Sequence, residues 1–86
     1  MIKRTGRDRF LRNVLIAAGN SGDRDLLPHV EALLGDASPL VRAMAVWAMR
    51  RLAAELLNEG MQRRHLAREG DAAVRAEWQS SPAPAP

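Results

Sequence analysis

The sequence contains no cysteine and no tyrosine, and its aromatic residues are one phenylalanine and two tryptophans. Without cysteine, this chain forms no disulfide, iron–sulfur cluster or thiolate zinc site. No apolar run approaches the length that spans a bilayer, and no signal-peptide pattern opens the chain. We therefore expect a soluble protein of a reducing compartment, the cytoplasm.

The residues that are present favour helices. Alanine, leucine, valine and methionine carry most of the 47% of hydrophobic residues, and 86 residues are enough for one small domain. All but one of the 13 basic residues are arginines, and the net charge is +3. The planar guanidinium group suits phosphate, so this charge favours a nucleic-acid partner modestly, although a GC-rich genome gives the same composition.

Apolar spacing at helical period predicts an all-α fold with five helices, at residues 5–18, 25–34, 39–58, 61–69 and 71–78. Thr5 and Asp8 match a capping box at the start of the first helix. Either Gly19 or Gly22 is expected to end that helix in the left-handed conformation.

The clearest helix boundary follows Gly35, where Ser38 is placed to cap a helix that opens with Pro39. Gly70 and Asp71 repeat the arrangement of a stop followed by a cap. The closing residues 80–86, rich in proline and alanine, are expected to be a disordered tail.

An internal repeat links the first and third predicted helices. "DRFLRNVLIAAG" aligns without a gap on "SPLVRAMAVWAM", so that Phe10 matches Leu40 and Arg12 matches Arg42. Repeated helix pairs predict a short α-solenoid. We divide it into a helical domain at 1–79, with units at 1–36, 37–69 and, incompletely, 70–79.

The segment "DASPLVRAMAVWA" resembles a HEAT repeat, in which the aspartate and the arginine tie neighbouring units together. The resemblance implies that structural role for Asp36 and Arg42. On a wider view, "IKRTGRDRFLRNVLIAAGNSGD" followed by "LLGDASPLVRAMAVWAM" resembles the C-terminal HEAT-like region of epoxyqueuosine reductases, which complete queuosine synthesis in transfer RNA.

The resemblance implies that this region helps to hold transfer RNA while other domains carry out the reduction. Those domains bind cobalamin and two [4Fe–4S] clusters, and the chain has neither the cysteines nor the room for them. We therefore expect no cofactor in this chain and no enzymatic activity of the chain alone.

A basic group precedes and enters the first helix, although cations are disfavoured near a helix N-terminus. With the resemblance, it predicts an RNA-binding set that contacts phosphates of an anticodon stem-loop: Lys3, Arg4, Arg7, Arg9, Arg12 and Asn13. Neutralising about five phosphates would give a slope of log K against log salt of roughly −3.5 to −4.5. The alternative is a plain solvated face.

Two other functions remain open. The first is a protein-interaction or inter-domain docking module with no RNA binding of its own, whose partner is either the catalytic part of a parent reductase or a second copy of the chain. The second is a structural fragment without activity.

A second basic group at Arg50, Arg51, Arg63, Arg64 and Arg68 is expected to pair with Glu55, Glu59 and Glu69 at helical spacing. Trp47 is expected in the core, and His29 and His65 lack metal-ligand spacing.

Overall fold

Short helices make up the part of the chain that the computed structural model describes, residues 4–80, with side chains from Gly6 onward. They are α1 (Arg4–Ser21), η1 (Arg24–Leu26), α2 (Leu27–Leu33), α3 (Pro39–Ala53), η2 (Ala54–Leu56), α4 (Glu59–Arg68) and α5 (Ala72–Gln79), the two η segments being 3₁₀-helices. Every regular element of residues 4–80 is helical, which confirms the predicted all-α fold. Lys3 and the tail segment 81–86 lie outside the described residues.

Local capping fixes the boundaries that the sequence marks most clearly. The Ser38 Oγ accepts from the Val41 N–H (3.4 Å), and α3 then opens with Pro39. The Asp71 Oδ1 accepts from the second and third backbone N–H groups of α5, at 2.9 and 3.0 Å. Gly22, with φ of 71°, follows α1 and takes the left-handed conformation, so Gly22 rather than Gly19 ends the helix.

Two predicted helix boundaries are wrong. The helix α1 already includes Arg4, so Thr5 is not its N-cap. The Asp8 carboxylate does not serve the helix start and instead accepts a hydrogen bond from the Ser38 Oγ (2.9 Å). The third helix was expected to reach residue 58, but α3 ends at Ala53 and η2 follows as a 3₁₀ turn.

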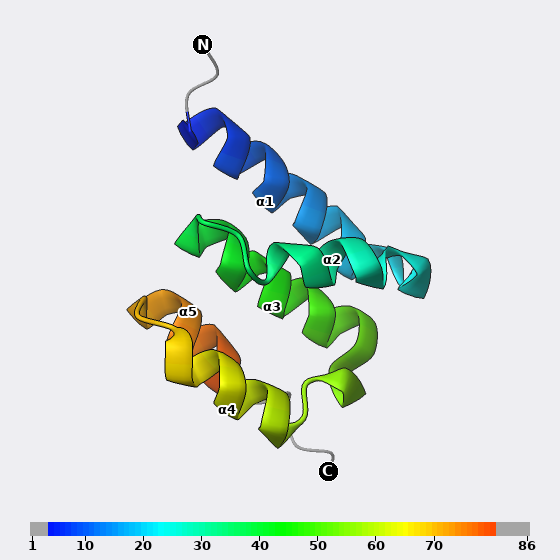
Figure 1. Ribbon diagram of the computed structural model, residues 1–86. Helices are drawn as coiled ribbons and strands as arrows, with labels where there is room; N and C mark the ends of the chain where they lie inside the picture. The colour runs from blue at the N-terminus through cyan, green and yellow to red at the C-terminus, as the bar shows by residue number, and fades with distance from the viewer. Residues whose placement is uncertain (1–3, 81–86) are drawn as a thin grey trace.

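The helices form two layers (Figure 1). In the first layer α3 lies between α1 and α5, and in the second layer α2 packs on α3 and α4 on α5. The core between them consists of small and aliphatic side chains from α1, α2, α3 and α5, closed at one end by Trp78. The division into units at 1–36, 37–69 and 70–79 stays a prediction, and α2 makes its main contact with α3.

The helices α1 and α3 approach each other closely at Gly19. A Cβ added at Gly19 would stand 2.6 Å from Cζ3 of Trp47 and 3.2 Å from Cα of Ala48. Real Cβ atoms do not come that close to a ring carbon, so glycine lets the two helices meet here. Trp47 is half-buried and packs against the core, with part of its ring at the surface.

Candidate nucleic-acid interface

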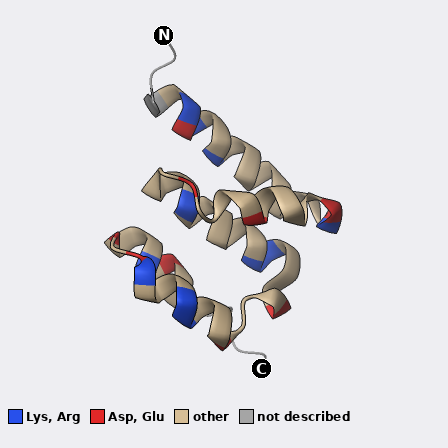
Figure 2. Ribbon diagram, viewed as in Figure 1, with Lys and Arg blue, Asp and Glu red and all other residues tan. Residues whose placement is uncertain are grey.

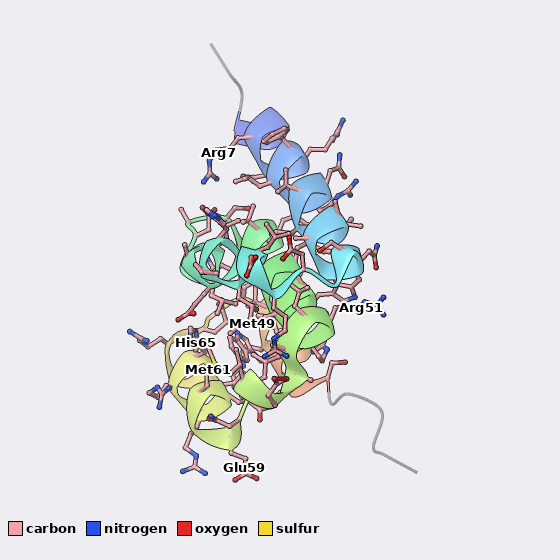
Figure 3. The ribbon with its side chains drawn as sticks, turned by 90° about the vertical axis from the view of Figure 1, so that its right-hand side faces the viewer. Arg7, Met49, Arg51, Glu59, Met61 and His65 are labelled. Carbon is pink, nitrogen blue, oxygen red and sulfur yellow. The ribbon has the colours of Figure 1, made fainter. Side chains whose placement is uncertain are left out.

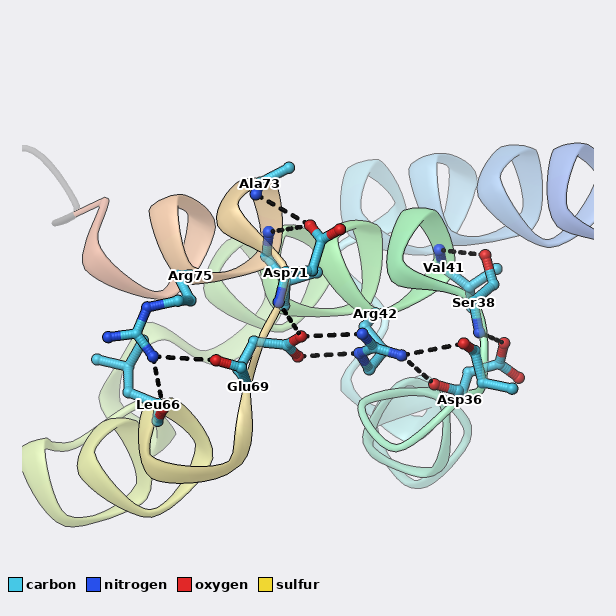
Figure 4. Close-up of polar contacts among 11 residues, drawn as sticks. Asp36, Ser38, Val41, Arg42, Leu66, Glu69, Asp71, Ala73 and Arg75 are labelled. Atoms are coloured by element: carbon cyan, nitrogen blue, oxygen red, sulfur yellow. Dashed lines mark hydrogen bonds and ion pairs between the residues drawn. The ribbon is translucent and has the colours of Figure 1, made fainter.

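A polar network joins the turns between helices, and Arg42 is its centre (Figure 4). The Arg42 Nη1 donates to the backbone carbonyls of Asp36 (2.9 Å) and Ala37 (3.1 Å), which lie in the turn before α3. Its Nε and Nη2 donate to the two carboxylate oxygens of Glu69, each at 2.9 Å. Arg42 thereby connects the turn before α3 with the turn before α5.

The turn before α5 repeats this arrangement one unit later. The Arg75 Nη1 donates to the carbonyls of Leu66 (2.7 Å) and Glu69 (3.0 Å). The Asp36 carboxylate accepts from the Ser38 N–H, and the Glu69 carboxylate accepts likewise from the N–H of Asp71. The two turns therefore share one hydrogen-bond pattern. The repeat thus includes the turns between the helices as well as the helices.

Hydrogen bonds from arginine lower the pKa values of both turn carboxyls. The pKa of Asp36 is lowered chiefly because Arg7 donates to it, against an opposing effect of burial. The pKa of Glu69 is lowered chiefly because Arg42 donates to it. The same hydrogen bonds raise the pKa values of Arg7 and Arg42. These groups hold the fold together while they remain charged.

The predicted RNA-binding residues do not all share one face. The Arg7 guanidinium donates to both oxygens of Asp36, at 3.1 and 2.6 Å, and lies 3.5 Å from Asp8. Arg7 points to the side on which α2 lies (Figure 3). Its side chain is 48% exposed, but its charge is already matched. The side chain of Arg4 and the whole of Lys3 lie outside the described residues.

Arg9, Arg12 and Asn13 lie on the other side of α1. Arg9 and Asn13 are exposed, and Arg12 is half-buried. The Arg12 Nη2 lies 3.4 Å from the Asn13 Oδ1, to which it donates, and its Nε is buried without a partner among the described residues. Within residues 6–80, neither Arg9 nor Arg12 forms an ion pair. These side chains therefore keep positive charge available on this side of α1.

Arg51 of α3 extends this basic surface and was missed as a site residue. It is exposed and points away from Arg7, to the opposite side of the molecule (Figure 3). Its Nη2 donates to the Asn20 Oδ1 of α1 (3.2 Å), and its guanidinium lies 5.6 Å from the centre of the Trp47 ring. We call Arg9, Arg12, Asn13, Asn20, Trp47 and Arg51 the outer basic face. The spacing of four residues between Trp47 and Arg51 was the signal in the sequence.

The predicted pairing of the second basic group is wrong. Glu69 binds Arg42, Glu55 binds Arg24, and Arg50 pairs with Glu77. The three arginines of this group that lie on α4 are exposed and form no ion pair with a described residue: Arg63, Arg64 and Arg68. Basic residues therefore occur on α4 as well as on α1 and α3 (Figure 2).

The histidines and acidic residues form no metal site in the described part of the chain, where no three potential ligands come together. The His65 ring stacks on Trp78, with ring centres 4.5 Å apart. The pKa of His65 is lowered chiefly by burial and to a smaller extent by the charges of Arg68 and Arg64. None of the helices between Arg4 and Gln79 has the length and hydrophobicity needed to cross a bilayer.

Comparison with known proteins supports the repeat architecture. The family model for the HEAT repeat matches residues 26–56, which contain η1, α2, α3 and η2. The chain is also similar to the epoxyqueuosine reductase of Xanthomonas campestris pv. campestris, with 41% identity over 49 residues. No solved structure matches the chain at a significant level.

This similarity is partial. The matched segment covers 56% of this chain but only 14% of the reductase. It supports a resemblance to part of that protein and does not assign the matched segment to a particular region of it. The residues of this chain do not fit an iron–sulfur cluster, because the sequence contains no cysteine to bind one.

Proposed function

We propose that this chain is a non-catalytic helical-repeat module that binds RNA through backbone phosphates on its outer basic face. The observation that carries the proposal is the pair of arginines on α1, Arg9 and Arg12, which no described carboxylate neutralises. Arginine donates to phosphate in planar, bidentate geometry, and such contacts supply much of the affinity for nucleic acid.

The second element of this face is the Trp47 and Arg51 pair on α3. The partly exposed indole holds the guanidinium over its ring, and Arg51 is linked to α1 through Asn20. Ordered in this way, Arg51 loses less side-chain entropy when it meets a phosphate. Arg7 lies on the far side with its charge matched by Asp36, so it contributes to binding only if RNA displaces that pair.

The similarity to an epoxyqueuosine reductase makes a transfer RNA anticodon stem-loop the ligand to test first. In this proposal the reduction belongs to other domains, which bring the cobalamin and the iron–sulfur clusters. A cytoplasmic location, where transfer RNA is modified, is part of the same proposal. Recognition would follow backbone shape and charge, because one short module offers little surface for base reading.

The test is binding of a labelled anticodon stem-loop by fluorescence anisotropy over a salt series from about 50 to about 200 mM. Arg9, Arg12 and Arg51 predict a slope of log K against log salt of about −2 to −3, at roughly −0.7 to −0.9 per phosphate. The double variant Arg9→Ala/Arg12→Ala should reduce the magnitude of that slope by about 1.5 and leave helicity unchanged.

The matched control is Arg63→Ala/Arg64→Ala, which removes the same charge from α4. It should weaken binding much less, because α4 lies in the other layer (Figure 1). Equal losses in the two double variants, or binding that does not depend on salt, would contradict the proposal.

A second candidate is a protein-interaction or inter-domain docking module with no RNA binding of its own. The observation that favours it is an apolar groove between α1 and α2, with a volume of about 730 Å³. If the stem-loop fails to bind at any salt concentration, this candidate takes the place of the first.

A further inference from the structure

An aromatic ring lies at the end of the outer basic face, where α3 meets α1. Trp47 is half-buried: one edge of its ring, at Cε3 and Cζ3, lies against Gly19, and part of the ring is at the surface. No described residue accepts a hydrogen bond from its indole N–H, and this nitrogen is not among the buried, unpaired atoms of the described chain. The ring therefore offers solvent a hydrogen-bond donor as well as apolar surface.

Arg51 lies over this ring as a positioned, flat cation. Its guanidinium is 5.6 Å from the ring centre, and its Nη2 donates to the Asn20 Oδ1 at 3.2 Å. The carboxylate one turn further along the chain, Glu55, binds Arg24 and not Arg51. Unpaired bases of RNA stack on aromatic rings and on guanidinium planes, and both surfaces occur together here.

One line of α1 connects this pair with the other charges of the outer basic face. Arg9, Asn13 and Asn20 are four and seven residues apart, spacings that return to the same side of a helix. From Arg9 to Asn20 the line is about 16 Å long, at about 1.5 Å per residue. A strand of RNA that meets the arginines of α1 can therefore continue to Trp47. A paired stem offers no base to stack there, because its bases are stacked inside the duplex.

We propose that Trp47 and Arg51 bind an unpaired nucleotide of an RNA loop, whose base stacks on the Arg51 guanidinium while backbone phosphates meet Arg9 and Arg12. The indole N–H of Trp47 donates to an oxygen of the same nucleotide. The inference rests on the proposed RNA binding and adds the class of nucleotide, unpaired rather than paired. Stacking accepts every base, so the pair selects loops without reading their sequence.

The first test compares two RNA stem-loops of equal length and charge, one with an intact loop and one with abasic loop nucleotides. We expect the abasic loop to bind about fivefold or more weakly, with the same slope of log K against log salt, because its phosphates remain and only base stacking is lost. Equal affinities would overturn the inference. Equal affinities that depend on salt would leave the proposed phosphate binding intact, so the two failures are distinguishable.

The second test changes the guanidinium plane and keeps its charge. Arg51→Lys alters an exposed side chain, so the fold should be retained. The variant should lose most of the preference for the intact loop over the abasic loop, with little change in the salt slope. Arg9→Lys, the matched change on α1, should affect both stem-loops alike. A preference that survives Arg51→Lys would contradict stacking at this site.

Tryptophan fluorescence gives a direct readout of the same contact. The sequence has two tryptophans, and Trp78 is only 6% exposed, so a change on RNA binding reports chiefly on Trp47. Trp78→Phe, which keeps a ring beside His65, leaves Trp47 as the one tryptophan and checks this assignment. We expect the intact loop to quench Trp47 emission and the abasic loop to quench it much less. Emission that stays unchanged when the intact loop is saturating would overturn the inference.

Discussion

Replacing Gly19 with alanine tests the packing of α1 on α3, on which the outer basic face depends. A new Cβ would stand 2.6 Å from the Trp47 ring and 3.2 Å from the backbone of Ala48. Overpacking of this kind costs about 1–3 kcal/mol, whereas alanine gains about 0.5–1 kcal/mol over glycine within a helix. The net expectation is a loss of up to roughly 2.5 kcal/mol in the free energy of unfolding.

Gly6→Ala is the matched control, because it lies in the same helix and a Cβ there meets nothing within 4 Å. It should gain up to about 1 kcal/mol from helix propensity. The two variants should differ by at least about 1 kcal/mol, or roughly 4–8 °C in Tm for a domain of this size. The measurement is thermal and urea unfolding followed by circular dichroism.

The Trp47 ring makes the shortest contact with a Cβ at Gly19. Adding Trp47→Ala to Gly19→Ala removes the ring from the crowded contact, so the double variant should be less destabilised than the sum of the two single changes. If Gly19→Ala proved as stable as Gly6→Ala, the close approach of α1 and α3 described above would be wrong.

Further predictions concern the turn network. Arg42→Ala should destabilise by about 1.5–3 kcal/mol, because it leaves the mostly buried carboxylate of Glu69 without its partner, whereas Arg24→Ala removes an exposed ion pair and should change urea unfolding very little. Asp36 and Glu69 have lowered pKa values in the folded chain, so the unfolded chain binds more protons as the pH falls. Stability should therefore be full above about pH 5 and decrease as the pH falls below about 4, toward the lowered pKa values of the folded chain. Arg42→Ala should flatten that decrease in a pH series of denaturation curves. Val41→Asp should abolish the helical circular dichroism signal, because it places a charge at a position that is 0% exposed.

The helix boundaries that could be predicted from the sequence are those that depend on neighbouring residues. Ser38 with Pro39, and Asp71 after Gly70, cap their helices within three residues, so local chemistry decides them. The capping box at Thr5 failed because Asp8, its other half, binds Ser38, thirty residues away. No local pattern shows such a contact.

The ion pairs show the same limit. Helical spacing predicted pairs within one helix, but the pairs of Arg42, Arg50 and Arg24 join residues separated by 27 to 31 positions. The candidate site was predicted only in part, because periodicity describes one helix and not the contacts between helices. Periodicity placed Arg9 and Asn13 together on α1, but it could not show that α3 brings Arg51 beside them or that Asp36 engages Arg7.

The central claim, that α1 and α3 together present a surface for RNA phosphates, is tested most directly by nuclear magnetic resonance. A chain of 9.5 kDa gives resolved amide signals, which are followed as unlabelled anticodon stem-loop is added at low salt. We expect shifts for the backbone of Arg9, Asn13 and Arg51 and for the Trp47 indole N–H. Shifts confined to α4, or no shifts at all, would contradict it.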